Sequence, residues 1–142
     1  MSYNECIEYF ELQVQNFMKD FETKEKNADG IYVYHPQYLP DIDEMILSCG
    51  LDEDNCTLAD IRDIIACYAN FNDWNELIHA NEFRLKLGKM LFEYRQDSDD
   101  EYSLLDSWQA YEMGLAGFDD EAKLGIFEAV FLGNVDDKED EF

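Results

Sequence analysis

Residues 57–95 read TLADIRDIIACYANFNDWNELIHANEFRLKLGKMLFEYR. Thr57 followed by Asp60 forms a capping pair at the start of a helix. Apolar residues at helical spacing then define its predicted buried face, which comprises Leu58, Ile61, Ile65 and Tyr68. Asn72 marks a second helix start before another apolar stripe. The stretch therefore predicts a helical scaffold. Whether residues 72–94 form one helix or two, with a break near Ala80 and Asn81, stays open.

Two further helices are predicted before this scaffold. Ser2 and Glu5 match a capping box. The apolar stripe that follows consists of Tyr3, Ile7, Phe10, Val14, Phe17 and Phe21. Pro40 suits the first position of a second, shorter helix, which Gly50 is expected to end.

The segment between these two helices favours extended structure. Residues 31–35 alternate β-favouring side chains, but a single strand without a partner cannot form a stable sheet. We therefore expect an extended segment laid across the helices. After the scaffold, Ser98 with Glu101, and then Asp119, mark two last helix starts. The sequence predicts an all-α fold: one bundle of about six helices over residues 1–134, then an acidic C-terminal tail over residues 135–142.

The chain carries a net charge of −24, from 34 acidic and 10 basic residues. A net charge of about 2 to 8 already keeps a small domain soluble, so this excess is expected to serve a purpose. The protein's own field opposes direct binding to nucleic acid or to an anionic membrane, and it attracts a basic protein surface. The 4 cysteines stand singly, and no apolar segment resembles a secretory signal or a membrane span. These features predict free thiols and a cytoplasmic location.

Motifs for catalysis or for metal binding are incomplete. Residues 52–63 contain an acidic cluster, but Thr57 replaces the glycine of an EF-hand loop and Asp63 replaces its final glutamate. Glu76 and His79 form only half of a di-iron helix motif, so a surface or satisfied histidine is expected. Glycine-rich phosphate loops and nucleophile motifs do not occur in the sequence. We therefore predict a protein that is not an enzyme and that uses no cofactor and no metal.

Charge is unevenly distributed along the chain. Residues 96–142 contain 15 acids and 2 bases, whereas residues 1–95 contain 19 acids and 8 bases. Four of the bases, Arg84, Lys86, Lys89 and Arg95, lie close together and are expected to neutralise nearby acids. The carboxylates predicted to bind a partner come from the acidic linker, the last helix start and the tail. They are Asp97, Asp99, Asp100, Glu101, Asp119, Asp120, Glu121, Asp136 and Asp137.

Acidic side chains held on rigid helices imitate the phosphates of DNA. B-form DNA carries two phosphates per 3.4 Å, so 24 negative charges match those of about 12 base pairs. In size, acidity, aromatic content and helical pattern, the chain resembles the DNA-mimic inhibitors of phages and mobile elements, namely the antirestriction and acidic anti-CRISPR proteins. The resemblance is one of composition and carries no shared motif. It implies an inhibitor that occludes the DNA-binding surface of a basic enzyme or effector.

Other functions fit the same charge. An immunity or adaptor protein would bind a basic toxin or nuclease, with Trp74, Trp108 or tyrosines as anchors inside an acidic rim. The end of the chain, residues 136–142, resembles the acidic C-terminal peptide of single-stranded-DNA-binding proteins, which recruits partners. An acidic surface that only keeps the protein soluble is the remaining alternative.

Overall fold

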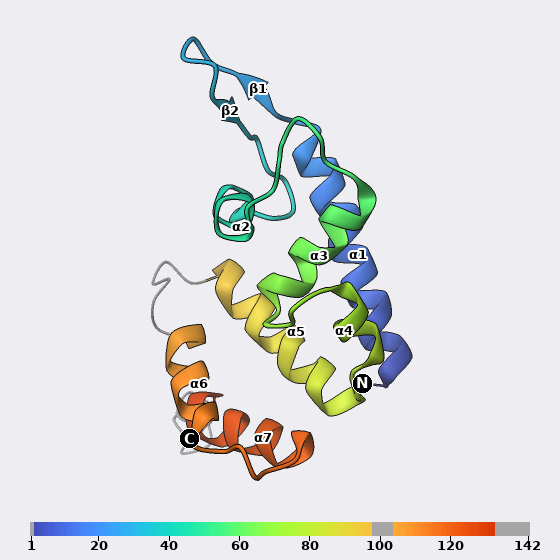
Figure 1. Cartoon of the computed structure of the whole chain (residues 1–142), viewed down its shortest axis with the longest axis vertical. Helices are drawn as coiled ribbons and strands as arrows, with labels where there is room; N and C mark the ends of the chain where they lie inside the picture. Colours follow the sequence, from blue (N-terminus) through green and yellow to red (C-terminus); the bar gives the residue numbers. More distant parts are fainter. Residues whose placement is uncertain (1, 98–103, 133–142) are drawn as a thin grey trace, which may run out of the picture.

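The computed structural model describes residues 2–97 and 104–132, and this part is helical apart from one small sheet (Figure 1). Its helices are α1 (Tyr3–Phe21), α2 (Ile42–Cys49), α3 (Leu58–Tyr68), α4 (Trp74–His79), α5 (Glu82–Asp97), α6 (Leu104–Met113) and α7 (Asp120–Phe127), and the π-helix η1 (Glu128–Leu132) continues α7. The predicted all-α fold of about six helices is therefore confirmed, with seven α-helices in the described part. The predicted capping box at Ser98 and Glu101 and the predicted tail, residues 135–142, lie outside the described residues.

Several helix starts lie where the capping residues predict them. The capping boxes of Ser2 with Glu5 and of Thr57 with Asp60 are both complete. Asp119 caps α7, because its side chain accepts a hydrogen bond from the backbone N–H of Ala122 at 2.8 Å. These side chains satisfy backbone N–H groups that have no partner inside the helix.

Two predicted helix starts are shifted by one position or more. The N-cap of α4 is Asp73 rather than Asn72, because the Asp73 carboxylate accepts from the backbone N–H of Glu76 at 2.8 Å. Pro40 is not the first residue of α2, which begins at Ile42 after the N-cap Asp41. Gly50 ends α2 in the left-handed conformation, with φ 68°, as predicted.

Residues 72–94 form parts of two helices rather than one. Ala80 is extended, with ψ 154°, and so interrupts the helical hydrogen bonding after His79. The side chain of Asn81 then accepts a hydrogen bond from the backbone N–H of Arg84 at 2.9 Å, which starts α5. The side-chain acceptor of Asn81 thus caps a new helix that begins directly after the break.

The extended segment has a strand partner, so the prediction of an unpaired segment is wrong. Strand β1 (Glu25–Lys26) pairs in antiparallel fashion with β2 (Tyr32–Val33), and Glu25 lies opposite Val33. Asn27 closes the turn, since its Oδ1 accepts from the backbone N–H groups of Asp29 and Ile31. Gly30 supplies the positive φ of 78° that this turn requires. The charged stretch before residue 31 therefore contains the missing strand.

A buried carboxylate fixes the chain between the hairpin and α2. Asp20 is 1% exposed and accepts hydrogen bonds from the backbone N–H groups of Gln37, Tyr38 and Leu39 at 2.7–2.9 Å. Such charge-assisted bonds are about twice as strong as neutral ones. Asp20 therefore ties the end of α1 to the segment that leads into α2.

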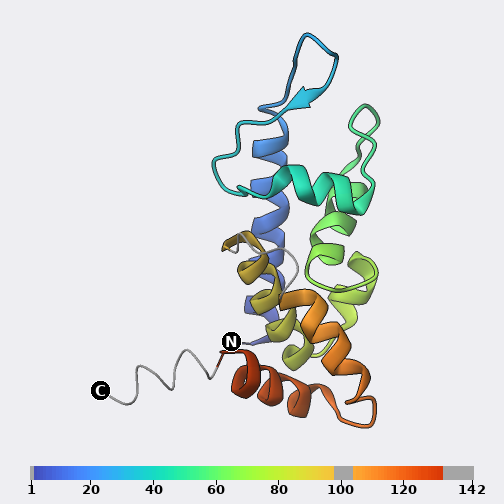
Figure 2. The ribbon, with the colours of Figure 1, turned by 90° about the vertical axis from the view of Figure 1, so that its left-hand side faces the viewer.

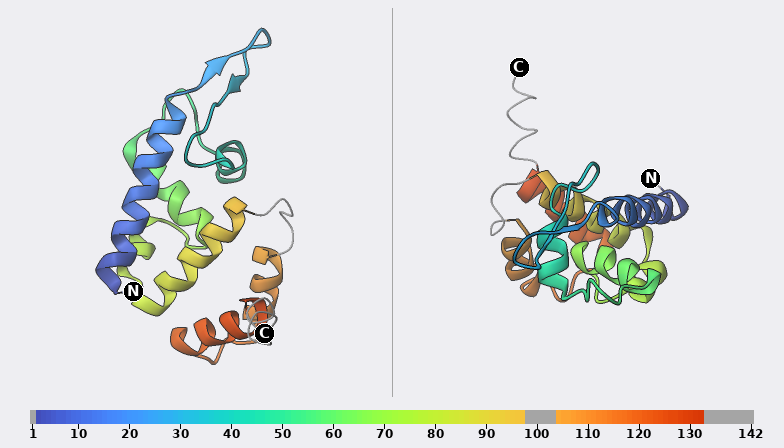
Figure 3. Two further views of the ribbon diagram at one scale, coloured as in Figure 1. Left: turned by 180° about the vertical axis from the view of Figure 1, so that it is seen from behind. Right: turned by 90° about the horizontal axis from the view of Figure 1, so that it is seen from above.

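Two hydrophobic clusters share α5. The larger cluster joins α1, α2, α3 and α4 to one side of α5 through Leu85 and Phe92. The smaller joins α6 and α7 to the other side, where Trp108 packs with Leu87 and Leu91. Figure 3 shows α5 between α1 and the α6–α7 pair. The molecule is elongated, with the hairpin at one end and α7 at the other (Figures 1 and 2).

Candidate partner-binding surface

Three of the predicted partner-binding carboxylates meet at the N-terminus of α7. Asp119, Asp120 and Glu121, which we call the acidic corner, occupy the N-cap and the first turn of this helix. The positive end of the helix dipole stabilises negative charge at these positions. Asp120 is oriented further by the side chain of Asn81, whose Nδ2 donates to its Oδ2 at 2.6 Å. Local capping and one tertiary hydrogen bond therefore hold two of the three carboxylates in place.

The acidic corner borders a shallow cavity of about 280 Å³. Its lining consists of the three carboxylates, the amide of Asn81 and the ring of Phe83. Carboxylates accept charge-assisted hydrogen bonds from lysine and arginine. The Phe83 ring already has a cation beside it, since its centre lies 5.6 Å from Nζ of Lys86. The chemistry of this lining therefore suits the cationic end of a partner's lysine or arginine side chain.

The side chains of the other six predicted carboxylates lie outside the described part of the structure. Asp97 is the last residue of α5, but its side chain lies outside the described part of the structure. Asp99, Asp100, Glu101, Asp136 and Asp137 lie entirely outside the described residues. The structure thus brings three of the nine predicted residues together.

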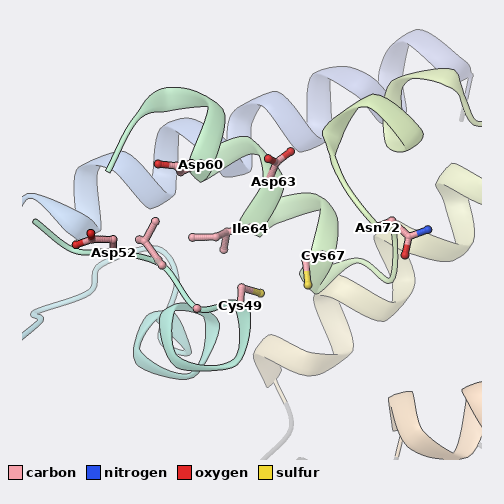
Figure 4. A pocket seen from close by; sticks show the side chains of 9 residues that line it. Cys49, Asp52, Asp60, Asp63, Ile64, Cys67 and Asn72 are labelled. Carbon is pink, nitrogen blue, oxygen red and sulfur yellow. The ribbon is translucent and has the colours of Figure 1, made fainter. Parts of the chain in front are cut away.

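A second acidic cavity, of about 370 Å³, lies between α2, α3 and the loop that joins them. Figure 4 shows its side chains, and its acidic members are Asp52, Asp60 and Asp63. Cys49 and Cys67 also contribute to the lining. In the sequence these acids form an incomplete calcium loop, and Asp60 also belongs to the capping pair with Thr57. Within the described residues, no group of three or more His, Cys, Asp or Glu side chains is placed to hold a metal ion.

Hydrogen bonds also orient the carboxylates of this second cavity. Asp52 accepts from the Asn55 side chain and from the backbone N–H of Asp54, and these bonds lower its pKa. Asp60 accepts from the backbone N–H of Thr57, and Asp63 accepts from that of Trp74, both at 3.0 Å. The spacing of Asp60 and Asp63, one helical turn apart on α3, was the signal in the sequence for this group.

The basic side chains in the described part of the chain contact other side chains of the same molecule. Of the 10 bases, Arg95 and Lys138 have side chains outside the description, and the other eight each contact an aromatic ring or a glutamate. The bases whose charged groups lie over an aromatic ring are Lys19, Lys24, Lys26, Arg62, Arg84, Lys86 and Lys89. The bases that form ion pairs do so as Lys86–Glu82, Lys89–Glu93 and Lys123–Glu112. The predicted neutralisation of nearby acids is therefore confirmed for Lys86 and Lys89.

Arg84 neutralises acids less directly. Its guanidinium lies 3.9 Å from the centre of the Phe71 ring and donates to the backbone carbonyl of Asn70. Its Nη1 is buried and has no hydrogen-bond partner among the described residues. Burial lowers the pKa of Arg84, and the negative charges of Glu112, Asp120 and Glu76 counteract this shift. A buried positive charge thus lies near one carboxylate of the acidic corner.

The proposed aromatic anchors are placed differently from the prediction. Trp108 is fully buried and packs edge-on against Phe127, so its prediction as a surface anchor is wrong. Trp74 is half-buried, with Arg62 over its ring. Phe118, by contrast, is 51% exposed and directly precedes the acidic corner. The sequence pattern did not reveal this residue, because an exposed phenylalanine and a buried one look alike within a turn.

The half motif of Glu76 and His79 lies on the exposed surface of α4. The Nδ1 atom of His79 is 2.7 Å from the backbone carbonyl oxygen of Asn75. Both carboxylate oxygens of Glu76 accept hydrogen bonds from Asn72. These contacts agree with the expectation of a satisfied surface histidine.

None of the helices in the described part of the chain combines the length and the apolarity that crossing a bilayer requires. Comparison with known protein families, with curated proteins and with solved structures found no match to this chain. Function must therefore be inferred from the surface itself.

Proposed function

We propose that this protein binds a basic protein and occludes a nucleic-acid-binding surface on it by presenting carboxylates where that surface binds phosphates. The partner is an enzyme or effector that acts on nucleic acid, in the manner of the targets of antirestriction and anti-CRISPR inhibitors. The protein acts by binding, without catalysis and without a cofactor, in the cytoplasm.

The observation that carries the proposal is the pairing of the basic residues. Only three lysine–glutamate pairs occur among the described side chains, while most lysines and arginines contact aromatic rings. A contact with a ring does not itself pair a cation with a carboxylate, although the cation still counts in the total charge. The net charge of −24 is the excess of acids that remains after every base is counted, and it acts on an external partner.

The shape of the molecule supports the same proposal. Helix α1 has 19 residues and, at 1.5 Å per residue, is about 28 Å long. The hairpin extends the molecule beyond one end of this helix (Figure 2). A cleft that holds about 12 base pairs of DNA is about 40 Å long. An elongated, negatively charged protein of this size matches such a cleft.

The mechanism is steric and electrostatic competition. The long-range field accelerates association, and salt weakens it, because exposed charges are screened beyond about 8 Å at physiological ionic strength. At short range, the cavity beside the acidic corner receives a cationic side chain of the partner. Duplex DNA and this protein then exclude each other from the same surface.

A displacement assay tests the proposal with defined proteins. Fluorescently labelled duplex DNA is bound to a type I restriction enzyme, to a guide-loaded Cas9 nuclease or to a histone-like DNA-binding protein, and the purified protein is titrated in. We expect displacement from at least one of the three at about 50 mM NaCl, and much weaker displacement at about 300 mM. Failure to displace DNA from any of them at low salt would overturn the proposal.

The role of the acidic corner is tested by neutralising it. The variant Asp119→Asn/Asp120→Asn/Glu121→Gln retains an N-cap, because asparagine also caps helices well. A matched control removes three exposed carboxylates on α1 and at its C-cap, as Glu8→Gln/Glu11→Gln/Glu22→Gln. We expect the corner variant to displace DNA at least tenfold more weakly and the control to stay within threefold. Equal losses would show that total charge, rather than this corner, determines binding.

A second function is favoured by the position of Phe118. An exposed aromatic side chain beside three carboxylates resembles the anchor of a protein–protein interface with an acidic rim, as in an immunity or adaptor protein that binds a basic toxin or nuclease. For that function, Phe118→Ala would weaken binding strongly, and excess duplex DNA would not release the partner. Release by DNA therefore distinguishes the two functions.

A further inference from the structure

The hairpin presents an apolar face to solvent. Side chains alternate across a strand, so Val33 points to the side opposite Tyr32, and Ile31 directly precedes the strand at the turn. Ile31 is 61% exposed and Val33 is 41% exposed, although both are β-branched apolar residues. Glu25 lies directly opposite Val33 and therefore shares its side of the sheet. We call Ile31, Val33 and Glu25 the hairpin face.

The two lysines of the hairpin lie on the other side. Lys26 is paired with Tyr32 in the register, and its Nζ lies 5.1 Å from the centre of that ring. Lys24 lies over the ring of Phe21 at 3.8 Å and near that of Tyr32 at 5.7 Å. The two sides of the hairpin thus differ in character. Its cations contact aromatic rings on one side, and its apolar residues stand beside a carboxylate on the other.

Contacts with the loop between α2 and α3, and one hydrogen bond at its own base, brace the hairpin. Two-residue strands are too short to be stable alone. The Tyr32 hydroxyl donates to the carboxylate of Asp54 at 2.5 Å, and the Tyr34 hydroxyl donates to that of Glu53. At the base, the Thr23 hydroxyl accepts from the backbone N–H of His35 at 2.8 Å. These bonds hold the hairpin face in a fixed conformation in which its apolar side chains remain exposed.

Charge decides between two possible occupants of this face. A second copy of the chain would bring another net charge of −24, and two-residue strands offer too short an edge for pairing against that repulsion. A basic protein is attracted instead. Glu25, whose carboxylate also lies 3.6 Å from Nε2 of His35, is at the edge of the apolar pair, where a lysine or arginine beside an apolar depression would meet it. The occupant is therefore a basic partner rather than a second copy.

We propose that the hairpin face is an apolar anchor that inserts into a depression bordering the basic surface of the partner. This inference rests on the proposed function and adds a contact at the end of the molecule opposite the acidic corner (Figure 1). The acidic corner supplies attraction that salt screens, and the hairpin face supplies apolar contact that salt does not screen. The complex is then held at both ends of its long axis.

The test compares a double substitution in the hairpin face with a single control substitution elsewhere on the surface. Ile31→Thr/Val33→Thr keeps β-branched residues, so the strand pairing is retained, but it removes the apolar contact. The control Leu47→Thr removes an apolar side chain that is 78% exposed on α2. Each variant is titrated against the restriction enzyme, the Cas9 nuclease, the histone-like protein and poly-L-lysine, at about 50 mM and about 300 mM NaCl. Circular dichroism and the thermal midpoint verify that each variant is folded.

We expect the hairpin variant to bind the responsive protein at least tenfold more weakly at both salt concentrations, with an unchanged salt dependence. Its binding to poly-L-lysine, which has no apolar depression, should equal that of the wild type, and Leu47→Thr should stay within twofold throughout. If the wild type binds and the hairpin variant binds equally well, or if Leu47→Thr loses as much, the hairpin inference is overturned and the proposed function stands. If the wild type binds none of the three proteins, the proposed function fails and this inference fails with it.

Discussion

Replacing Asp20 by asparagine is expected to destabilise the protein more than any other single removal of a negative charge in the described structure. The carboxylate is buried, and its two oxygens accept three backbone hydrogen bonds from the segment that leads into α2. Asparagine has the same shape but replaces one oxygen with a donor. At least one backbone N–H group then faces another N–H group.

The magnitude follows from these contacts. The Oδ1 atom accepts from Gln37, and Oδ2 accepts from Tyr38 and Leu39. If the amide nitrogen takes the position of Oδ1, the bond from Gln37 is lost, at about 1–2 kcal/mol. The two remaining bonds change from charge-assisted to neutral, at about 1 kcal/mol each. The expected loss is about 3 kcal/mol of the free energy of unfolding.

Urea denaturation followed by circular dichroism measures this loss. With an m-value of about 1.5 kcal/mol per M, a loss of about 3 kcal/mol lowers the midpoint by about 2 M. Glu22→Gln is the matched control, because it removes the same charge two residues away on the surface. Relief of self-repulsion should leave the control unchanged or slightly more stable. Equal midpoints for Asp20→Asn and Glu22→Gln would refute the assigned role of Asp20.

Three further predictions concern the net charge, the partly buried Arg84 and the hydrogen-bonded Asp52. Raising NaCl from about 10 mM to about 0.5 M is expected to raise the thermal midpoint in calorimetry, because salt screens the repulsion of a chain with net charge −24; a falling midpoint would contradict this. Arg84→Met should lower the free energy of unfolding by less than about 1.5 kcal/mol in urea titrations, because a long side chain still covers Phe71, and Arg84→Ala should lower it about twice as much. Asn55→Ala should raise the Asp52 pKa in an NMR titration. Hydrogen bonds hold that pKa below its unfolded value, so their stabilisation is present above about pH 4 and is lost as the pH falls through the folded-state pKa. The stabilities of wild type and Asn55→Ala should therefore converge as the pH falls below about 4; a constant gap would argue against the assignment.

Local sequence signals predicted the helices well. The capping boxes of Ser2 and Thr57 act through neighbours three residues away, so the sequence contains all of their partners. The pairing of β1 with β2 was missed although Asp29–Gly30 is a typical turn pair, because β1 consists of the charged residues Glu25 and Lys26 and lacks the apolar alternation of a recognisable strand. Asp20 was missed because its partners are backbone groups 17–19 residues away, and a tertiary contact of this kind has no sequence pattern.

Part of the candidate surface could also be predicted from residues that are neighbours in the sequence. Asp119, Asp120 and Glu121 are adjacent in sequence, so any fold that starts a helix there places them together. Their contact with Asn81 and Phe83 depends on the packing of α7 against α5 and was not visible. Trp108 was mistaken for a surface residue because the small cluster that buries it combines side chains from α5, α6 and α7.

The division of the core around α5 gives each half of the molecule its own optical reporter. The chain has two tryptophans, and Trp74 packs against the larger cluster while Trp108 lies inside the smaller one. Replacing either by phenylalanine leaves a single indole, whose emission reports the solvent exposure of one cluster alone. Single-tryptophan variants can therefore show whether the two clusters unfold together, and whether a bound partner at the acidic corner protects the small cluster first.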